Sequence, residues 1–417
     1  MHALSPNIYA DARKRFELLR LLTWVNLDEA LQNSDGNLAG EVRRWFDQIS
    51  DLNAQQLIDE ATPFWWFNVG QCWRAATEGS PQVAEYAANM LLAAFDSFFA
   101  CLPEGATVRV DGNRDSEIVL PKLGLNVARA LKPTAITRSG TNTIAVHTTD
   151  GTVTMSLDQE AQGARLSVPG HVEQYVLCAP TPALIGDDPR AELTGPDFDS
   201  HAFTQMLGDA LSLIQNECRE LYDQIQAANK WYIPIVSHDI QVHRSYTRAD
   251  LTGVIFLSQA LDHVLLAEAV VHEFYHGVLN SILKTEPLFD ETDSGETFYS
   301  PWRDDPRPLR GLLHAIYVFS GVARFYALSN NTLAQGDYAE SVRLRRSKLH
   351  QQLRCALAQV PMAKLTPVGK QVLDAIAAQV NDEDAADLYH PGVTALLEDH
   401  LKAWRERNPA LEVQPHH

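Results

Sequence analysis

The chain has 417 residues, 45% of them hydrophobic, so it is expected to be a globular protein of roughly two or three domains. Its formal net charge of −19 argues against nucleic acid or an anionic membrane as the main partner. The sequence contains no apolar run of about 18 residues and no signal-peptide pattern, and its five cysteines are scattered without a CxxC pair. These features predict a cytoplasmic protein that binds neither nucleic acid nor a membrane.

The first part of the chain is expected to be helical. Between about residues 10 and 100, segments such as EVRRWFDQI and VAEYAANMLLAAFDSFFACL carry apolar side chains at three- and four-residue spacing. The segment TPFWWFNVGQCW places three tryptophans within twelve residues and is expected to anchor the core. We therefore predict a helical N-terminal region over residues 1–104.

The middle of the chain favours β-structure. Short β-rich runs alternate with turns at ATVRV, SEIVLP, TIAVHTTDGTVTMSL, ARLSV and QYVLCA. Within them, HTTDGTVTM has Asp-Gly between two alternating segments, which is a strong hairpin signal. A loop-forming stretch, GDDPRAELTGPDFDS, ends this β-rich region, which we place at residues 105–197.

Helical periodicity returns in residues 198–417. Two short strands, YIPIVS and GVIFLS, are expected just before the long helix-forming segment LDHVLLAEAVVHEFYHGVLNSILK, and the chain is again mostly helical from 308. A strand beside that helix would be able to hold an extended peptide by main-chain pairing. The predicted fold class is therefore α+β: mostly helical, with a β-rich middle region and a long helix preceded by short strands.

That long helix carries a metal-binding pattern. His272 and His276 lie four residues apart, and Glu273 follows the first histidine, which is the HExxH arrangement of zinc peptidases. On a helix the two imidazoles lie on one face, one turn apart, and are able to bind one metal ion. Two polar side chains on this face are best explained by a bound metal, because the burial of polar groups without partners is unfavourable. The other residues near the same stripe are apolar, namely Leu261, Leu265, Ala269, Leu279 and Leu283.

A catalytic metal site usually has three protein ligands, so a third is expected elsewhere. The third histidine of the elongated peptidase motif is absent, because Leu279 and Ile282 occupy its glycine and histidine positions. His314 is the best candidate, because it is a lone basic group in the apolar segment RPLRGLLHAIYVFSGVARFYAL. His238 and His243 are weaker alternatives. A turn-rich stretch, expected to be a solvated loop, holds the downstream acids Glu286, Asp290, Glu291, Asp293 and Glu296.

Three histidines leave two chemistries open. In a zinc metallopeptidase, the metal polarises the carbonyl and Glu273 is the general base for the attacking water. In a non-haem Fe(II) oxygenase, three ligands leave room for O2 and a bidentate 2-oxo acid, and 2-oxoglutarate would balance the +2 charge that neutral imidazoles leave. Its distal carboxylate would need an arginine. The segment YSPWRDDPRPLRG supplies Arg303, Arg307 and Arg310, although a surface loop of Arg–Asp pairs explains it equally well. A peptide-binding protein with a structural metal is a third, weaker reading, because structural zinc normally has four ligands.

The segments AEAVVHEFYH, YSPWRDDPRP and GLLHAIYVFSGVARF together resemble the HExxH motif-containing peptide-modification proteins associated with ribosomally made, post-translationally modified peptides. The resemblance is specific over about residues 250–330. It implies an iron- and 2-oxoglutarate-dependent β-hydroxylase whose partner is a precursor peptide, with His272, His276 and His314 as Fe(II) ligands. Arg303 and Arg307 then become candidates for binding 2-oxoglutarate or substrate. Residues 198–417 would form the catalytic domain.

Overall fold

The computed structural model divides the chain into two compact units. One, here the mixed unit, contains Glu17–Gly208 and Asn229–Leu261. The other, here the histidine unit, contains Met1–Phe16, Asp209–Ala228 and Asp262–His417. The division of the chain into three domains, at residues 1–104, 105–197 and 198–417, remains a prediction. The structure describes residues 6–49, 51–110, 117–157, 164–195, 197–239, 241–290, 295–329, 333, 335–382, 388–409, 411 and 413, without the side chains of 6–13 and 16.

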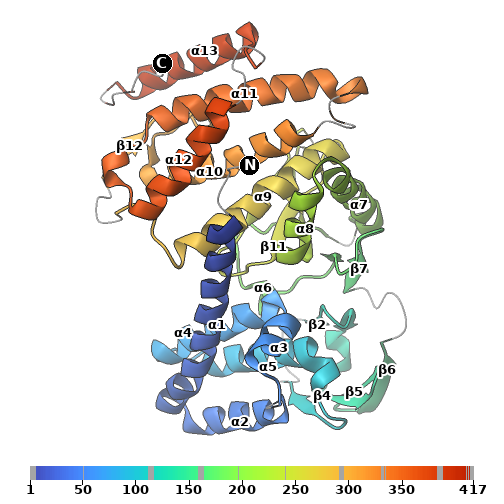
Figure 1. Ribbon diagram of the computed structural model, residues 1–417. Coiled ribbons are helices and arrows are strands. Elements are labelled where there is room, and N and C mark those ends of the chain that lie inside the picture. Colours follow the sequence, from blue (N-terminus) through green and yellow to red (C-terminus); the bar gives the residue numbers. More distant parts are fainter. Residues whose placement is uncertain are drawn as a thin grey trace. The chain divides into compact units, whose positions relative to one another are not determined.

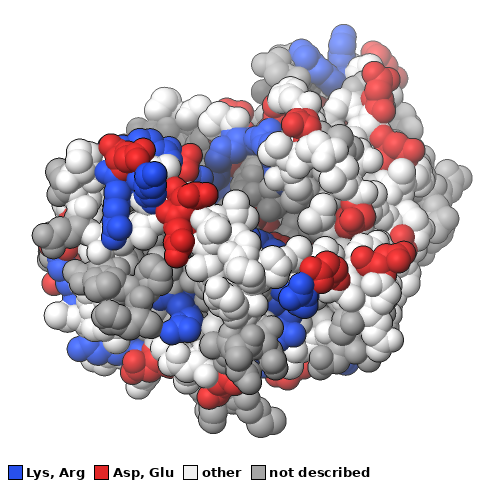
Figure 2. Space-filling view, turned by 90° about the horizontal axis from the view of Figure 1, so that it is seen from above, with Lys and Arg blue, Asp and Glu red and all other residues white. Residues whose placement is uncertain are grey.

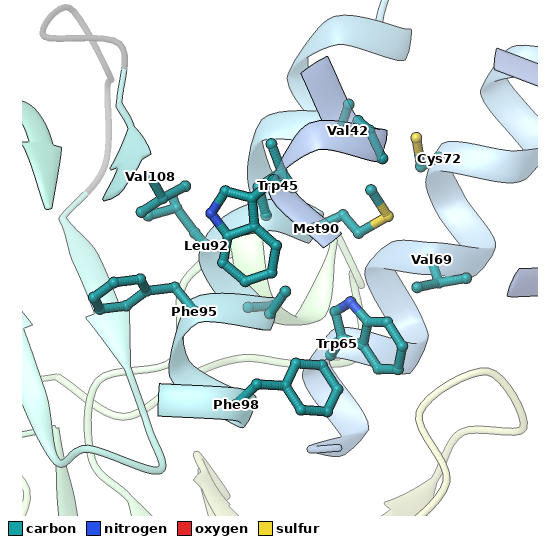
Figure 3. Close-up of a cluster of buried hydrophobic side chains, with 14 of the residues drawn as sticks. Val42, Trp45, Trp65, Val69, Cys72, Met90, Leu92, Phe95, Phe98 and Val108 are labelled. Atoms are coloured by element: carbon teal, nitrogen blue, oxygen red, sulfur yellow. The ribbon is translucent and has the colours of Figure 1, made fainter. Parts of the chain in front are cut away.

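The N-terminal part of the mixed unit is helical, as predicted. Thr62 caps one of these helices by accepting the Trp65 N–H, and Pro63 occupies its first position. Trp65 is fully buried, and Figure 3 shows it among the apolar side chains of this core, whereas Trp73 is 38% exposed. The helices are α1 (Pro6–Ser34), which begins in the histidine unit, α2 (Gly36–Phe46), α3 (Ala54–Glu60), α4 (Pro63–Thr77) and α5 (Val83–Phe98).

A four-stranded antiparallel sheet follows, in the order β1-β4-β5-β6. The predicted hairpin is confirmed as β5–β6, with Thr149 and Asp150 as its turn residues and Gly151, at φ 143°, as the first residue of β6. Two strands, β3 and β4, were not predicted from the sequence. Strand β3 pairs with β2, and β4 pairs with β1 and β5. The strands are β1 (Thr107–Arg109), β4 (Pro133–Gly140), β5 (Thr143–Thr148) and β6 (Gly151–Ser156), with β2 (Ile118–Leu120) and β3 (Leu125–Val127) forming a separate antiparallel pair.

The second sheet of the mixed unit has the order β10-β11-β9-β8-β7. Its inner pairs, β11–β9 and β9–β8, are parallel, and the outer pairs are antiparallel. Both predicted strands before the long helix are confirmed here as β9 and β11, and every residue in them is buried. The strands are β7 (Arg165–Ser167), β8 (Tyr175–Leu177), β9 (Trp231–Ile235), β10 (Ser245–Thr247) and β11 (Val254–Ser258), and the short helix α6 (Pro182–Ile185) comes between β8 and β9 in the chain.

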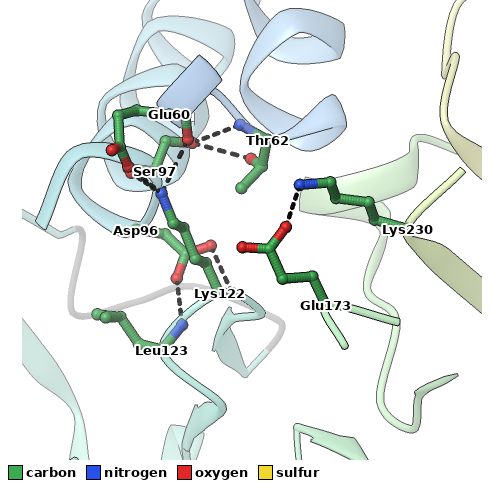
Figure 4. Close-up of polar contacts among 8 residues, drawn as sticks. All are labelled: Glu60, Thr62, Asp96, Ser97, Lys122, Leu123, Glu173 and Lys230. Atoms are coloured by element: carbon green, nitrogen blue, oxygen red, sulfur yellow. Dashed lines mark hydrogen bonds and ion pairs between the residues drawn. The ribbon is translucent and has the colours of Figure 1, made fainter. Parts of the chain in front are cut away.

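A partly buried polar network fixes the end of α5 to the loop after β2 (Figure 4). The Asp96 carboxylate accepts the backbone N–H groups of Lys122 and Leu123, each at 3.0 Å. The Lys122 ammonium donates to the Ser97 carbonyl at 2.7 Å and to the Glu60 carboxylate at 2.6 Å. Burial raises the pKa of Asp96 to about 6 against the opposing effect of these donors, so this carboxyl is costly to ionise in the folded state.

The described residues of the histidine unit are mostly helical, with one two-stranded pair (Figure 1). The helices are the end of α7 (Ser200–Glu217), α8 (Arg219–Ala228), α9 (His263–Leu283), α10 (Leu309–Leu328), α11 (Ala339–Ala358), α12 (Pro367–Asp382) and α13 (Pro391–Arg407), and the pair is β12 (Thr297–Phe298) with β13 (Arg307–Pro308). The predicted helix AFTQMLGDALSLIQNECRELYDQIQAA is divided into α7 and α8 at Cys218, and the predicted helix around His272 and the one after residue 308 are α9 and α10. The mostly helical α+β class is therefore confirmed.

Helix α10 is the apolar core helix that the sequence predicted. By length and composition it would be able to cross a membrane, alone among the described helices, but 61% of its apolar window is buried, as in the core helix of a soluble protein. It packs against α9, where Gly321 leaves space for the Tyr275 ring.

Acidic and basic side chains are interspersed on the face of the molecule that Figure 2 shows.

Candidate metal centre

Helix α9 holds two of the predicted ligands on one face. Its first turn is capped by the Asp262 carboxylate, which accepts the N–H groups of Val264 and Leu265. One turn apart on this helix, the Nε2 atoms of His272 and His276 lie 3.2 Å from each other, and their ring centroids are 4.8 Å apart. Both imidazoles therefore point toward the same small volume beside α9.

Helix α10 brings the third histidine to this pair. The helix begins at Leu309, and its His314 ring lies 5.9 Å from the His276 ring, centroid to centroid. The His314 Nε2 atom is buried and has no hydrogen-bond partner among the described residues. A buried nitrogen without a partner costs free energy, so a ligand for this atom would be stabilising. The structure thus places together the three histidines that the sequence singled out, here called the histidine site.

Burial keeps these three imidazoles neutral. It lowers the pKa of His272 to about 4, where Glu268 opposes the shift and Arg345 adds to it. It lowers the pKa of His276 to about 3, with the neighbouring His272 and His314 contributing, and that of His314 to about 4, with Arg310 contributing. Neutral imidazoles at pH 7 have lone pairs available, as metal ligation requires.

The spacing of the α9 pair fits a shared metal ion. Two nitrogens that each lie about 2.1 Å from one ion, at an angle between octahedral and tetrahedral, are about 3.0–3.4 Å apart. The observed 3.2 Å lies in that range, although it also allows an N–H···N hydrogen bond between the rings. In the part of the chain that the structure describes, no group of three or more His, Cys, Asp or Glu side chains is gathered tightly enough to hold an ion as it stands. Three-point binding would therefore require the His314 side chain to move toward the pair.

Glu273, the glutamate of the HExxH pattern, faces the interior. It follows His272 by one position and so points about 100° around the helix from it. The residue is 2% exposed. A peptide substrate would reach this carboxylate only through a rearrangement of the surrounding side chains.

The three candidate arginines differ in their positions. The side chain of Arg303 is 59% exposed and that of Arg307 34%, and both bind the Asp305 carboxylate, at 3.0 Å and 3.1 Å. These two pairs match the surface-loop alternative. Arg310 lies one turn before His314 on α10, as expected, and its charge contributes to the lowered pKa of His314. The geometry therefore associates Arg310, rather than Arg303, with the histidine site.

The other candidate ligands have partners of their own or lie outside the described residues. His238 and His243 belong to the mixed unit, where they contact Glu192 at 2.9 Å and Ser258 at 3.2 Å. Glu286 pairs with Arg15, and Glu296 pairs with Lys364 at 2.9 Å. Asp290 lies in the connection after α9 and also has a partner. Two of the acids, Glu291 and Asp293, lie outside the described residues.

Sequence reasoning missed a partly buried ionic group beside His272. Glu268, one turn before His272 on α9, binds Arg345 of α11 through both of its carboxylate oxygens. It also accepts the Tyr326 hydroxyl of α10 at 2.7 Å. We call these three residues the Glu268 cluster. The four-residue spacing from Glu268 to His272 was visible in the sequence, whereas the position of Arg345, which lies two α-helices later, was not.

No known family model matches this chain, and no curated protein matches it either.

Proposed function

We propose that this protein is a cytoplasmic metalloenzyme that uses Fe(II) and 2-oxoglutarate to hydroxylate the β-carbon of a residue in a ribosomally made precursor peptide. His272, His276 and His314 would be the metal ligands. The observation that carries the proposal is the convergence of three neutral, partly buried imidazoles from α9 and α10, one with a buried Nε2 that lacks a partner. Because three imidazole ligands carry no charge, a dianionic co-substrate would balance the +2 charge of the ion.

Bound iron would supply the oxidation of the C–H bond by O2, coupled to conversion of the 2-oxo acid to succinate and CO2. The chain's own residues would hold the three imidazoles in position and keep water away. Phe319 supports the latter role, because its ring packs against His272 at 5.1 Å and stacks on Trp302 at 4.7 Å. These two rings form an aromatic wall beside the histidine site.

A zinc metallopeptidase is the second candidate. It is favoured by the HExxH spacing itself, which α9 holds in a continuous helix with the two histidines on one face. It would require Glu273 to take a proton from the attacking water. The 2% exposure of Glu273 weighs against that role, and for this reason we place the peptidase second.

The first experiment tests the co-substrate. Protein purified without oxygen and given Fe(II) and 2-oxoglutarate should develop the weak visible charge-transfer band of a chelated 2-oxo acid. With the precursor peptide and O2, it should release succinate and add one oxygen atom per modified residue. Wild-type protein that shows no band, no succinate and no gain in peptide mass, yet cleaves a peptide with zinc, would establish the peptidase instead.

The second experiment uses Glu273→Gln, which separates the two chemistries. A peptidase variant without this carboxylate should lose essentially all cleavage of peptide bonds. A hydroxylase variant should still bind iron and retain turnover of 2-oxoglutarate. The wild-type protein and the matched variant Glu286→Gln, which changes an acid in the loop after α9, serve as controls. Zinc-dependent peptide cleavage that disappears only in Glu273→Gln would refute the hydroxylase proposal.

A further inference from the structure

The Glu268 cluster lies on the same helix face as the histidine site. Glu268, His272 and His276 follow one another at four-residue spacing on α9, so their side chains form one row. Glu268 binds Arg345 of α11 by two hydrogen bonds. A charged group of α11 thus reaches the neighbourhood of the first histidine.

Glu268 orients one edge of the Arg345 guanidinium. Its Nε donates to Glu268 Oε2 at 3.0 Å, and its Nη2 donates to Glu268 Oε1. Within the described residues, no hydrogen bond runs from Nη1. The side chain is 26% exposed, so it is only partly enclosed. A guanidinium has five N–H donors in a rigid fork, so a carboxylate on one edge leaves the Nη1 side able to bind a second anion.

Phe319 links this arginine to the histidine site. The guanidinium carbon of Arg345 lies 6.0 Å from the Phe319 ring centroid, and the His272 ring lies 5.1 Å from the same centroid. Arg345 and His272 are therefore separated by no more than the sum of these two distances. A short dicarboxylate is able to extend along this aromatic wall with one end at each residue.

We propose that Arg345 binds the distal carboxylate of a 2-oxo diacid whose other end reaches the histidine site, while Glu268 and Tyr326 hold the guanidinium in position. This inference rests on the proposed function and assigns the co-substrate contact to a residue on α11, not to Arg303, Arg307 or Arg310. Glu268 fixes the orientation of the arginine, and Tyr326 fixes the orientation of Glu268. The ligand carboxylate would contact the Nη1 edge.

A purely structural ion pair joining α9 to α11 is the competing explanation. In a purely structural ion pair, every N–H donor of the arginine would normally have a partner within the protein, and none would be left for a ligand. The two explanations differ in what they predict for ligands that share the 2-oxo acid group but differ in the second carboxylate. Pyruvate lacks that carboxylate, whereas 2-oxoglutarate has it.

The test is calorimetric titration of the full chain, loaded with Mn(II) in place of iron, with 2-oxoglutarate and with pyruvate in the absence of peptide. We expect the wild type to prefer 2-oxoglutarate by about tenfold to a hundredfold, the usual effect of a charge-assisted bidentate contact. Arg345→Lys and Arg345→Gln should lower the affinity for 2-oxoglutarate to that for pyruvate. Neither the affinity for pyruvate nor the Mn(II) stoichiometry should change. Arg343→Lys, an exposed arginine on the same helix, is the matched control and should behave as the wild type.

The outcomes separate the inference from the function on which it rests. A wild type that binds Mn(II) but not 2-oxoglutarate refutes the proposed function. A wild-type preference that survives in Arg345→Lys, or that is lost in Arg310→Lys instead, refutes the assignment of Arg345 alone. If the zinc-loaded protein prefers a peptide with a free C-terminal carboxylate over its amidated form, and Arg345→Lys removes that preference, the arginine binds a peptide terminus and not a 2-oxo diacid.

Glu268→Gln provides a second test that keeps Arg345 in the protein, in case the arginine variants fail to fold. The amide keeps one acceptor oxygen and turns the other into an N–H donor that faces an N–H of Arg345, so the paired contact that orients the guanidinium is lost. The preference for 2-oxoglutarate over pyruvate should therefore decrease, with the affinity for pyruvate unchanged. An unchanged preference in a folded Glu268→Gln protein contradicts the proposal.

Discussion

Gly321 is the position where α10 has no room for a side chain against α9. A Cβ atom there would lie 2.2 Å from Cδ2 and 2.3 Å from Cε2 of Tyr275, both atoms of a stiff ring and not of a flexible chain end. Restoring ordinary contact requires the ring and the Cβ to separate by roughly 1 Å or more. Such overpacking costs about 1–3 kcal/mol, and the better helix propensity of alanine returns about 1 kcal/mol. The Tyr275 ring lies between two helices and cannot easily move away, so the upper end of the overpacking cost applies, and we expect Gly321→Ala to destabilise the protein by about 2 kcal/mol.

The same substitution should weaken metal binding. His314 lies on α10 seven residues before Gly321, so a displacement of α10 from α9 separates His314 from His272 and His276. For a unit of this size, a loss of about 2 kcal/mol corresponds to a decrease in melting temperature on the order of 5 °C. Thermal unfolding measures the first effect, and titration with Co(II) measures the second.

Gly277→Ala is the matched control on the facing helix. No atom lies within 4 Å of the Cβ that it would add, so the gain in helix propensity should stand alone, at up to about 1 kcal/mol of stabilisation. A Gly321→Ala protein that melts with the wild type and binds metal equally well would refute the close packing of α9 on α10. Destabilisation of both variants by the same amount would show that the effect does not come from Tyr275.

Three further predictions concern single residues. His314→Ala should abolish stoichiometric metal binding, measured by metal analysis after dialysis, because two imidazoles alone form a weak site; full occupancy in this variant would place the third ligand elsewhere. Gly369→Ala should destabilise the protein in thermal unfolding, because its Cβ would lie 1.9 Å from the Leu288 carbonyl oxygen; an unchanged melting temperature would contradict that contact. The pKa of Asp96 is raised to about 6 in the fold, so its contribution to stability is complete below about pH 4 and is lost as the pH rises through 6. The free energy of unfolding of the wild type relative to Asp96→Asn should therefore fall by about 2 kcal/mol from pH 4 to pH 7, and parallel pH profiles would contradict the raised pKa.

Elements with strong periodicity or turn chemistry were predictable from the sequence. The apolar runs that became β9, β11 and α10, and the Asp-Gly signal of the β5–β6 hairpin, depend on local residue order and were read correctly. Strand β4 was missed because its sequence, PTAITRSG, begins with proline and contains two charged or flexible positions. It is held as a strand by pairing with β1 and β5 on both sides, which is a tertiary effect.

The histidine site was predictable to the extent that helix geometry determines it. His272 and His276 lie together because four residues make about one turn, and Arg310 precedes His314 by one turn because α10 begins at Leu309. The meeting of α9 with α10 was inferred from chemistry alone, since nothing local determines which helices pack. The position of Arg345 could not be predicted for the same reason. Its ion pair with Glu268 joins residues 77 positions apart in the sequence.

The two candidate chemistries place opposite demands on charged groups near these helices. A peptidase needs a carboxylate open to water and substrate beside the metal, whereas an oxygenase that uses a 2-oxo diacid needs a cation open to the ligand at a short distance from it. Glu273, the carboxylate next to the first ligand, is 2% exposed. Arg345, the cation that acts on the same ligand, keeps its Nη1 edge without a partner among the described residues. A buried Glu273 carboxylate and an Arg345 guanidinium with one unpaired edge favour binding of an anionic co-substrate over activation of water. A titration with 2-oxoglutarate, done before any peptide is identified, would test that inference first.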